Sequence, residues 1–171
     1  MDVADKRGQD PRRPTVILER MQVKELGHLV LYVRDLGRSI GFYRDVLGWR
    51  QIQPRGETLR FPAAAFTSGR THHELLLIEV GEDAQPQPRG RHLGLYHFGL
   101  KVGDSDDEMR DALTTIQEAG VTVMGMSDHT VSHSLYILDP DGNEIELYVD
   151  VAGVDWSDPA AVLAPVRPLA L

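Results

Sequence analysis

Apolar and polar positions follow two different periods along this chain, and their order predicts a unit of one strand, one helix and three further strands. Residues 23–33, VKELGHLVLYV, have the apolar run of a buried strand. Residues 35–49 change to helical spacing, with Asp35 placed as an N-cap and Gly48 placed to end the helix. Shorter strands are predicted near residues 49–54, 59–67 and 73–80.

The same unit returns in the second half of the chain. Residues 28–35, HLVLYVRD, and residues 97–104, HFGLKVGD, share the pattern His-x-x-Leu-x-Val-x-Asp. A helix over 105–119, closed by Gly120, follows the second copy, and strands are predicted near 121–127, 133–138 and 144–149. An internal repeat of a supersecondary unit implies two similar halves that pack around a shared surface.

This repeat predicts an α+β fold in which two βαβββ modules pair in one domain over residues 21–150. The modules span 21–81 and 93–150 and are expected to form an open, barrel-like metal cavity. Residues 1–20 lack periodicity, so we expect a flexible or loosely docked arm. Residues 151–171 are interpreted as a tail that wraps the surface, closes one mouth of the cavity or is poorly ordered. Exposed apolar residues there favour a homo-oligomer.

The composition narrows the class of ligand. The 171 residues are 42% hydrophobic and 26% charged, which suits one compact domain. A formal charge of −8 and the lack of a long Lys/Arg run argue against nucleic acid or an anionic membrane as the partner, and favour a small molecule. No apolar run approaches a membrane span and the N-terminus has no signal layout, so the expected location is cytoplasmic.

With no cysteine in the sequence, any metal must be held by histidine and carboxylate groups. In the last strand, Glu144, Glu146 and Tyr148 share one face because alternate strand residues do. If both first strands and the last strand bound one cavity, His28, His97 and Glu146 can converge. Two imidazoles and one carboxylate suit Fe(II), with Mn(II) next. Taken singly, each histidine is typical of a half-buried strand and Glu146 of a solvated edge, but the repeated histidine favours a functional role.

A longer motif near the end of the chain carries a family resemblance. Residues 129–148, HTVSHSLYILDPDGNEIELY, contain His129, then Leu135-Tyr136, then Asp139-Pro140-Asp141-Gly142, then Glu146. The Asp-Pro-Asp-Gly run is typical of a type I turn that reverses the chain between two antiparallel strands. Over residues 23–150 the chain resembles the vicinal-oxygen-chelate superfamily, and within it the type I extradiol ring-cleavage dioxygenases of the catechol 2,3-dioxygenase kind, in a single-domain form. Ser127 is a minor departure from the family pattern.

The resemblance implies a ligand set and a reaction. It implies Fe(II) held by His28, His97 and Glu146, and a catecholic substrate cleaved with O2. His129 and Tyr136 would surround the bound catecholate. Because imidazole titrates near neutral pH, His129 is the expected proton donor during O–O cleavage, and Tyr136 the hydrogen-bond donor to a catecholate oxygen.

A third catalytic histidine is expected in the run HHELLL at residues 72–77. The resemblance points to His73, with His72 as the alternative, in an acid–base role on the other side of the substrate. Outside this interpretation, both His73 and His129 are also compatible with surface loop histidines.

Two other functions remain open from the sequence. Glyoxalase-type enzymes of the same superfamily use a second acid on the strand that closes the first half, and Glu79 lies near that position. A closed site of two histidines and two glutamates for Zn or Ni would support isomerisation without oxygen. The third possibility is a metal-free binding protein of the same fold, which the three intact ligand residues argue against.

Overall fold

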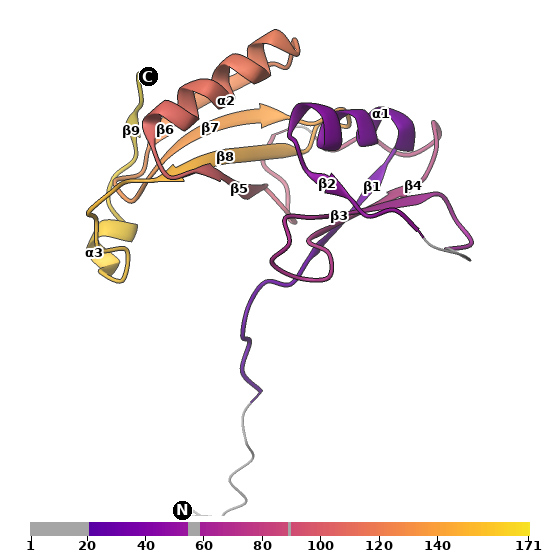
Figure 1. The fold of residues 1–171 in the computed structure, drawn as a ribbon, viewed down its shortest axis with the longest axis horizontal. Helices are drawn as coiled ribbons and strands as arrows, with labels where there is room; N and C mark the ends of the chain where they lie inside the picture. Colours follow the sequence, from indigo (N-terminus) through magenta and orange to yellow (C-terminus); the bar gives the residue numbers. More distant parts are fainter. Residues whose placement is uncertain (1–20, 55–58, 89) are drawn as a thin grey trace, which may run out of the picture.

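Each half of the chain folds into its own sheet with a helix against one face (Figure 1). The computed structural model describes residues 21–54, 59–88 and 90–171, so the arm expected over 1–20 lies outside the described residues. Within the described part of the chain, no helix combines the length and apolar character needed to cross a membrane.

The first module forms a four-stranded sheet in the order β1-β4-β3-β2. Its first strand runs parallel to its last, and the other pairs are antiparallel. Its α-helix continues directly into a π-helical turn, labelled η1. The elements are β1 (Leu29–Val33), α1 (Leu36–Ile40), η1 (Gly41–Val46), β2 (Arg50–Gln51), β3 (Ala63–Thr67) and β4 (Leu75–Glu79).

The second module repeats this topology with one strand added, in the order β5-β8-β7-β6-β9. Again the first strand is parallel to the module's fourth. Its elements are β5 (His97–Gly103), α2 (Asp106–Glu118), β6 (Val123–Asp128), β7 (Ser132–Leu138), β8 (Glu144–Asp150), α3 (Pro159–Val162) and β9 (Arg167–Pro168). The α+β prediction and the repeated βαβββ order are confirmed. The two sheets do not close into a barrel in the described chain.

Local signals set the ends of both long helices. The Asp35 side chain accepts a hydrogen bond from the Arg38 backbone N–H at 2.7 Å, and Ser105 caps α2 in the same way. Gly48 and Gly120 follow the helices with φ of 69° and 68°, a left-handed conformation that glycine adopts without a steric penalty. The predicted cap at Asp35 and the predicted helix ends at Gly48 and Gly120 are confirmed.

One strand is shorter than the sequence predicts, and the C-terminal segment follows one of the courses left open. The strand predicted over 23–33 is shorter, because β4 begins at Leu75, opposite Leu29, and offers no backbone partner to the residues before it. The C-terminal segment is ordered by pairing: Ser127 of β6 lies opposite Pro168 of β9, and Leu171 packs against the core. The tail therefore wraps the outer edge of the second sheet.

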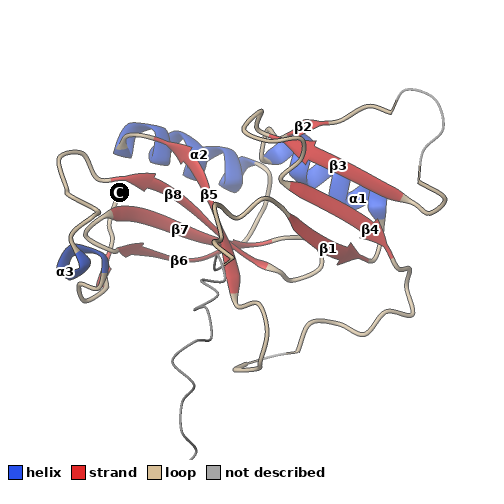
Figure 2. Cartoon of the chain, turned by 90° about the horizontal axis from the view of Figure 1, so that it is seen from below, coloured by secondary structure: helices blue, strands red, loops and turns tan. Residues whose placement is uncertain are grey.

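Alternation along the strands separates a core face from a helix-free face. Leu31 and Val33 of β1 are buried beneath the helix, as are Ile145 and Leu147 of β8. Tyr32, between the two buried residues of β1, is 71% exposed. Both helices lie on the same side of the sheets in Figure 1, and Figure 2 shows the molecule from below, with the strands of both sheets in view. Each sheet therefore leaves one face without a covering helix.

The two modules are joined by the turn between β7 and β8. Tyr43 of η1 is fully buried and its hydroxyl donates to Asp139 Oδ2 at 2.8 Å. The Asp139 carboxylate also accepts from the backbone N–H of Asp141 and from Asn143, through its N–H and its side-chain amide. Burial, and then the Asp139 charge, raises the pKa of Tyr43, so this phenol stays a donor. The backbone bond from Gly142 N–H to the Asp139 carbonyl, at 3.1 Å, closes the predicted turn.

We expect Tyr43→Phe to destabilise the protein by about 1 to 3 kcal/mol, because it leaves a buried carboxylate short of one donor while keeping the packed ring. Urea denaturation followed by circular dichroism measures the free energy of unfolding. Tyr32→Phe, on an exposed ring, is the matched control and should change it by less than about 0.5 kcal/mol. Equal stabilities of the Tyr43→Phe and Tyr32→Phe variants would show that this bond does not hold the modules together.

Candidate metal centre

An imidazole and a carboxylate face each other on the helix-free face of the second sheet. In the parallel β5–β8 pair, His97 lies level with Glu144 and Gly99 lies level with Glu146. His97 Nε2 lies 3.1 Å from Glu146 Oε2. A Cβ at Gly99 would lie 3.3 Å from the Tyr148 ring and 3.8 Å from the Glu146 carboxylate, so glycine leaves room beside these groups. A nitrogen and an oxygen donor thus meet on one face.

Tyr136 and His129 extend this group along the same face. Tyr136 of β7 lies opposite Glu146 of β8, and its hydroxyl donates to Glu146 Oε1 at 3.2 Å. His129 Nε2 lies 2.7 Å from the same hydroxyl. Because a phenol has one proton and Glu146 accepts it, the tautomer consistent with both contacts has His129 donating from Nε2 to the tyrosine oxygen. The three side chains form a short proton-sharing chain.

The protonation state of Tyr136 follows from its surroundings. Burial and the negative charge of Glu146 raise its pKa to about 12. The phenol therefore keeps its proton at neutral pH and acts as a hydrogen-bond donor. Thr130, next to His129, has φ of 71°, an uncommon conformation for a β-branched residue, and such positions concentrate at functional sites.

Three histidines gather at the start of β1 and β4 in the first module. The His28 and His73 ring centroids are 4.6 Å apart, and those of His72 and His73 are 4.5 Å apart. The Nδ1 atoms of His72 and His73 are 2.6 Å apart, so one of them is unprotonated. Burial, followed by the charges of His72 and His28, lowers the pKa of His73. The structure therefore places His73 beside His28.

A single chain does not bring all three predicted ligands together. Arg34, six residues after His28, donates its backbone N–H to Asp141 in the β7–β8 turn at 3.1 Å. At about 3.3 Å per strand residue, His28 is about 20 Å from that contact, at the opposite end of β1. Among residues 21–54, 59–88 and 90–171, no three His, Asp or Glu side chains are arranged to hold a metal. The convergence expected within one chain is therefore not found, and the ligand assignment stays a prediction.

The register of the strands identifies the true counterpart of Glu146 in the first module. Glu146 lies level with Gly99, and Leu76 lies level with Val30, the residue that corresponds to Gly99 in the repeat. Leu76 therefore occupies the position that a fourth acidic ligand would need. Glu79 instead accepts a hydrogen bond from the Leu36 backbone N–H at 2.8 Å, at the start of α1. It serves the helix N-terminus.

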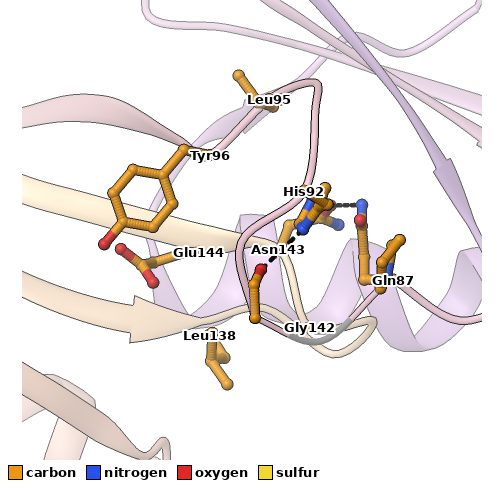
Figure 3. Close-up of a pocket in the computed structure, with 10 residues that line it drawn as sticks. Gln87, His92, Leu95, Tyr96, Leu138, Gly142, Asn143 and Glu144 are labelled. Carbon is orange, nitrogen blue, oxygen red and sulfur yellow. Dashed lines mark hydrogen bonds between the residues drawn. The ribbon is translucent and has the colours of Figure 1, made fainter.

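A pocket of about 160 Å³ adjoins the cluster around His97 and Glu146 (Figure 3). It lies between the segment that joins the two modules and the start of β8. Its lining residues are Gln87, Pro88, Gly90, His92, Leu95, Tyr96, Leu138, Gly142, Asn143 and Glu144. Figure 3 shows the Tyr96 ring extending toward the Glu144 carboxylate. The sequence interpretation gave Glu144 no role beyond that of a neighbour nearer the turn; its place opposite His97 depends on strand register, which the sequence does not specify.

Comparison with known proteins places these observations in a family. The Glyoxalase/Bleomycin resistance protein/Dioxygenase superfamily profile matches residues 25–147. A catechol-2,3-dioxygenase of Bacillus subtilis is 34% identical over 131 residues, which cover 77% of this chain and 43% of that protein. The glutathione transferase FosA of Serratia marcescens is 30% identical over 127 residues, which cover 74% of this chain and 82% of that protein.

A solved glyoxalase/dioxygenase from Nostoc punctiforme matches the fold with a TM-score of 0.63 at 21% identity, covering 75% of this chain and 92% of that one. The chain spans 43% of the length of that catechol-2,3-dioxygenase, 63% of a biphenyl-2,3-diol 1,2-dioxygenase of Rhodococcus globerulus and 42% of a metapyrocatechase of Cupriavidus necator. Its likeness to them is therefore a likeness to part of each.

We expect Glu146→Gln to remove stoichiometric binding of Fe(II) or Mn(II), while Glu79→Gln retains it. Both side chains lie on the last strand of a module, but only Glu146 faces a histidine across a parallel pair. Anaerobic titration of the metal-free protein, followed by metal analysis of the dialysed complex, measures the stoichiometry. Loss of metal in Glu79→Gln with an intact fold would restore the four-ligand arrangement.

Proposed function

The chain belongs to the Glyoxalase/Bleomycin resistance protein/Dioxygenase superfamily, and from that premise we propose that it is an Fe(II)-dependent extradiol dioxygenase acting on a catechol. The observation that carries the proposal is the chain of contacts from His129 through Tyr136 to Glu146, beside His97. A metal that only polarises a carbonyl has no need of His129 and Tyr136. Ring cleavage, in contrast, requires a proton donor and a hydrogen-bond donor to the negatively charged substrate oxygen.

The residues of the second sheet fit a divalent ion of intermediate softness. His97 and Glu146 present a nitrogen and an oxygen at close range, and no cysteine competes. The buried Nδ1 of His97 has no hydrogen-bond partner within the described residues, and the remaining ring nitrogen faces Glu146. When bound, Fe(II) would supply the redox-active centre at which catecholate and O2 meet. His28 would be the third ligand.

The protein groups then have separable tasks. Tyr136, whose pKa is raised to about 12, stays protonated and donates a hydrogen bond to an anionic substrate oxygen. His129 holds a proton at Nε2 and delivers it as charge develops. His73, with a lowered pKa, is suited to accept a phenolic proton on the other side. In the overall reaction one ring C–C bond breaks and both oxygen atoms of O2 enter the product, so no further reductant is required.

The third ligand requires a second copy of the chain. One chain presents His97 and Glu146 on its second sheet, and His28 and His73 beside its first. The whole length of β1 separates His28 from the contact of Arg34 with Asp141 in the second module. His28 directly precedes β1 and His97 begins β5, and both strands are unpaired edges of their sheets within the described residues. We propose a two-fold dimer in which the first sheet of each copy faces the second sheet of the other.

A second candidate function is favoured by sequence similarity to an enzyme of another class. The glutathione transferase FosA is 30% identical to this chain, close to the 34% of the Bacillus dioxygenase. A metal-dependent transferase or lyase of this fold would use the same metal ligands without consuming O2. Oxygen uptake separates the two functions.

We expect protein reconstituted anaerobically with Fe(II) to consume O2 when catechols are added in air, with a yellow ring-opened product. His129→Ala should keep iron and catechol binding but lose about 10²- to 10⁴-fold in turnover, because it removes the proton donor. An oxygen electrode and absorbance spectroscopy measure both. His133→Ala, at an imidazole that contacts Asp106 of α2 on the opposite face of β7 from Tyr136, is the control for imidazole loss. Absence of uptake with every catechol, together with tight Zn or Ni binding, would favour the glyoxalase or transferase alternative.

Mixing two inactive variants tests the two-copy site. A dimer of one His28→Ala chain and one Glu146→Ala chain has one site with every ligand intact if ligands come from different copies. Each variant alone should be inactive, and random reassociation should restore about a quarter of wild-type oxygen uptake, since half the dimers are mixed and each has one intact site. A chain that closes its site on itself would give no recovery on mixing.

The converse mixture is the control. Wild-type chain combined with the double variant His28→Ala/Glu146→Ala gives no intact site in the mixed dimer if the site is shared. It gives one intact site if the site lies within a chain.

A further inference from the structure

The imidazole of His97 contacts two tyrosine rings and a carboxylate, but one of its nitrogens makes no hydrogen bond with the described residues. The rings of Tyr96 and Tyr136 contact it edge-on, with centroids 4.7 Å and 5.6 Å away. Nε2 faces Glu146. Nδ1 is buried and makes no hydrogen bond with the described residues. A buried donor without a partner costs free energy, so this atom calls for an explanation.

The Glu144 carboxylate is placed to act as the hydrogen-bond acceptor for His97 Nδ1. It lies level with His97 in the parallel β5–β8 pair, and its Oε1 is 3.7 Å from His97 Nδ1. That distance is longer than a hydrogen bond, and a small rotation of either side chain closes it. The Glu144 side chain is 22% exposed, so it is partly shielded from water.

The Tyr96 ring, just before β5, also approaches Glu144. The negative charge of Glu144, first among the causes, raises the pKa of the Tyr96 phenol. Figure 3 shows the two groups meeting at the wall of the pocket. The corresponding acid of the first module is Glu74, which is next to Leu75 and therefore level with His28, but Glu74 bonds to Ser68. The arrangement of a carboxylate beside the ligand histidine is thus specific to the second module.

We propose that Glu144 is a positioning residue for His97. Its carboxylate accepts a hydrogen bond from Nδ1–H and so fixes the tautomer in which Nε2 has a free lone pair for the metal. Partners of this kind orient ligand histidines and increase their basicity, and their loss typically weakens metal affinity. The inference rests on the proposed metal site, but it concerns residues of a single chain and does not depend on the two-copy arrangement.

Metal affinity provides the first test. We expect Glu144→Ala to bind Mn(II) or Fe(II) about 10- to 100-fold more weakly than wild type in anaerobic titrations of the metal-free protein. Glu144→Gln keeps an acceptor oxygen without the charge and should fall between the two. Glu118→Gln, on an exposed helix end, removes one carboxylate at a distance and should leave the affinity unchanged. Wild-type affinity in Glu144→Ala would overturn the proposal.

The Nδ1–H proton of His97 provides a second readout. Long-range ¹H–¹⁵N spectra of the Zn(II)-loaded protein, in which the metal in place of a proton occupies Nε2 beside Glu146, should show an Nδ1–H proton of His97 that is protected from exchange with water in wild type and in Glu144→Gln. In Glu144→Ala that proton should exchange rapidly with water. An equally protected Nδ1–H proton in Glu144→Ala would overturn the proposal, and if that variant does not fold, the affinity of the Glu144→Gln variant decides.

The two tests separate this inference from the proposed function. If metal binds but no O2 is consumed, the dioxygenase proposal fails and the affinity series still tests Glu144 for a transferase or lyase. If O2 is consumed but Glu144→Ala binds metal as wild type does, the dioxygenase proposal stands and the role of Glu144 fails.

Discussion

One buried carboxylate, Asp139, supports the arrangement of the whole second sheet and its attachment to the first. It is 5% exposed and accepts hydrogen bonds from Tyr43 and Asn143 side chains and from the backbone of its own turn. A carboxylate can remain buried only when its oxygens are satisfied in this way. The turn therefore has one conformation, and the strands on either side of it, β7 and β8, are fixed in register. Tyr136 and Glu146 face each other because of that register.

Alternation along the strands determines which side chains are available for binding. Each helix covers one face of its sheet, so alternate strand residues enter the core and the others lie on the opposite face. In β8 this places Ile145 and Leu147 in the core and Glu144 and Glu146 on the opposite face. Acidic residues in a strand are costly unless they are paired, and here both meet polar groups of the neighbouring strands, His97 and Tyr136.

Features determined by nearby residues could be predicted from the sequence. The helix caps at Asp35 and Ser105, the helix-ending Gly48 and Gly120, and the turn at Asp139 depend on local chemistry, and the structure contains them all. Register could not be predicted. The repeat suggested Glu79 as a counterpart of Glu146, whereas strand pairing gives Leu76, three residues earlier, and an odd offset moves a side chain to the other face. The placement of His28 relative to Glu146 depends on contacts between whole modules, which no short motif encodes.

The sheet edges also limit how copies of this chain add to one another. The outer edge of the first sheet is β2, of two residues, and that of the second is β9, also of two residues and containing Pro168, which has no backbone N–H to donate. Within the described residues, the longer unpaired edges are β1 and β5, at the other end of each sheet order. Strand-to-strand addition at β2 and β9 is therefore blunted, and backbone pairing between copies is limited to β1 and β5. A closed assembly that covers both of these strands in every copy leaves no long edge for further growth.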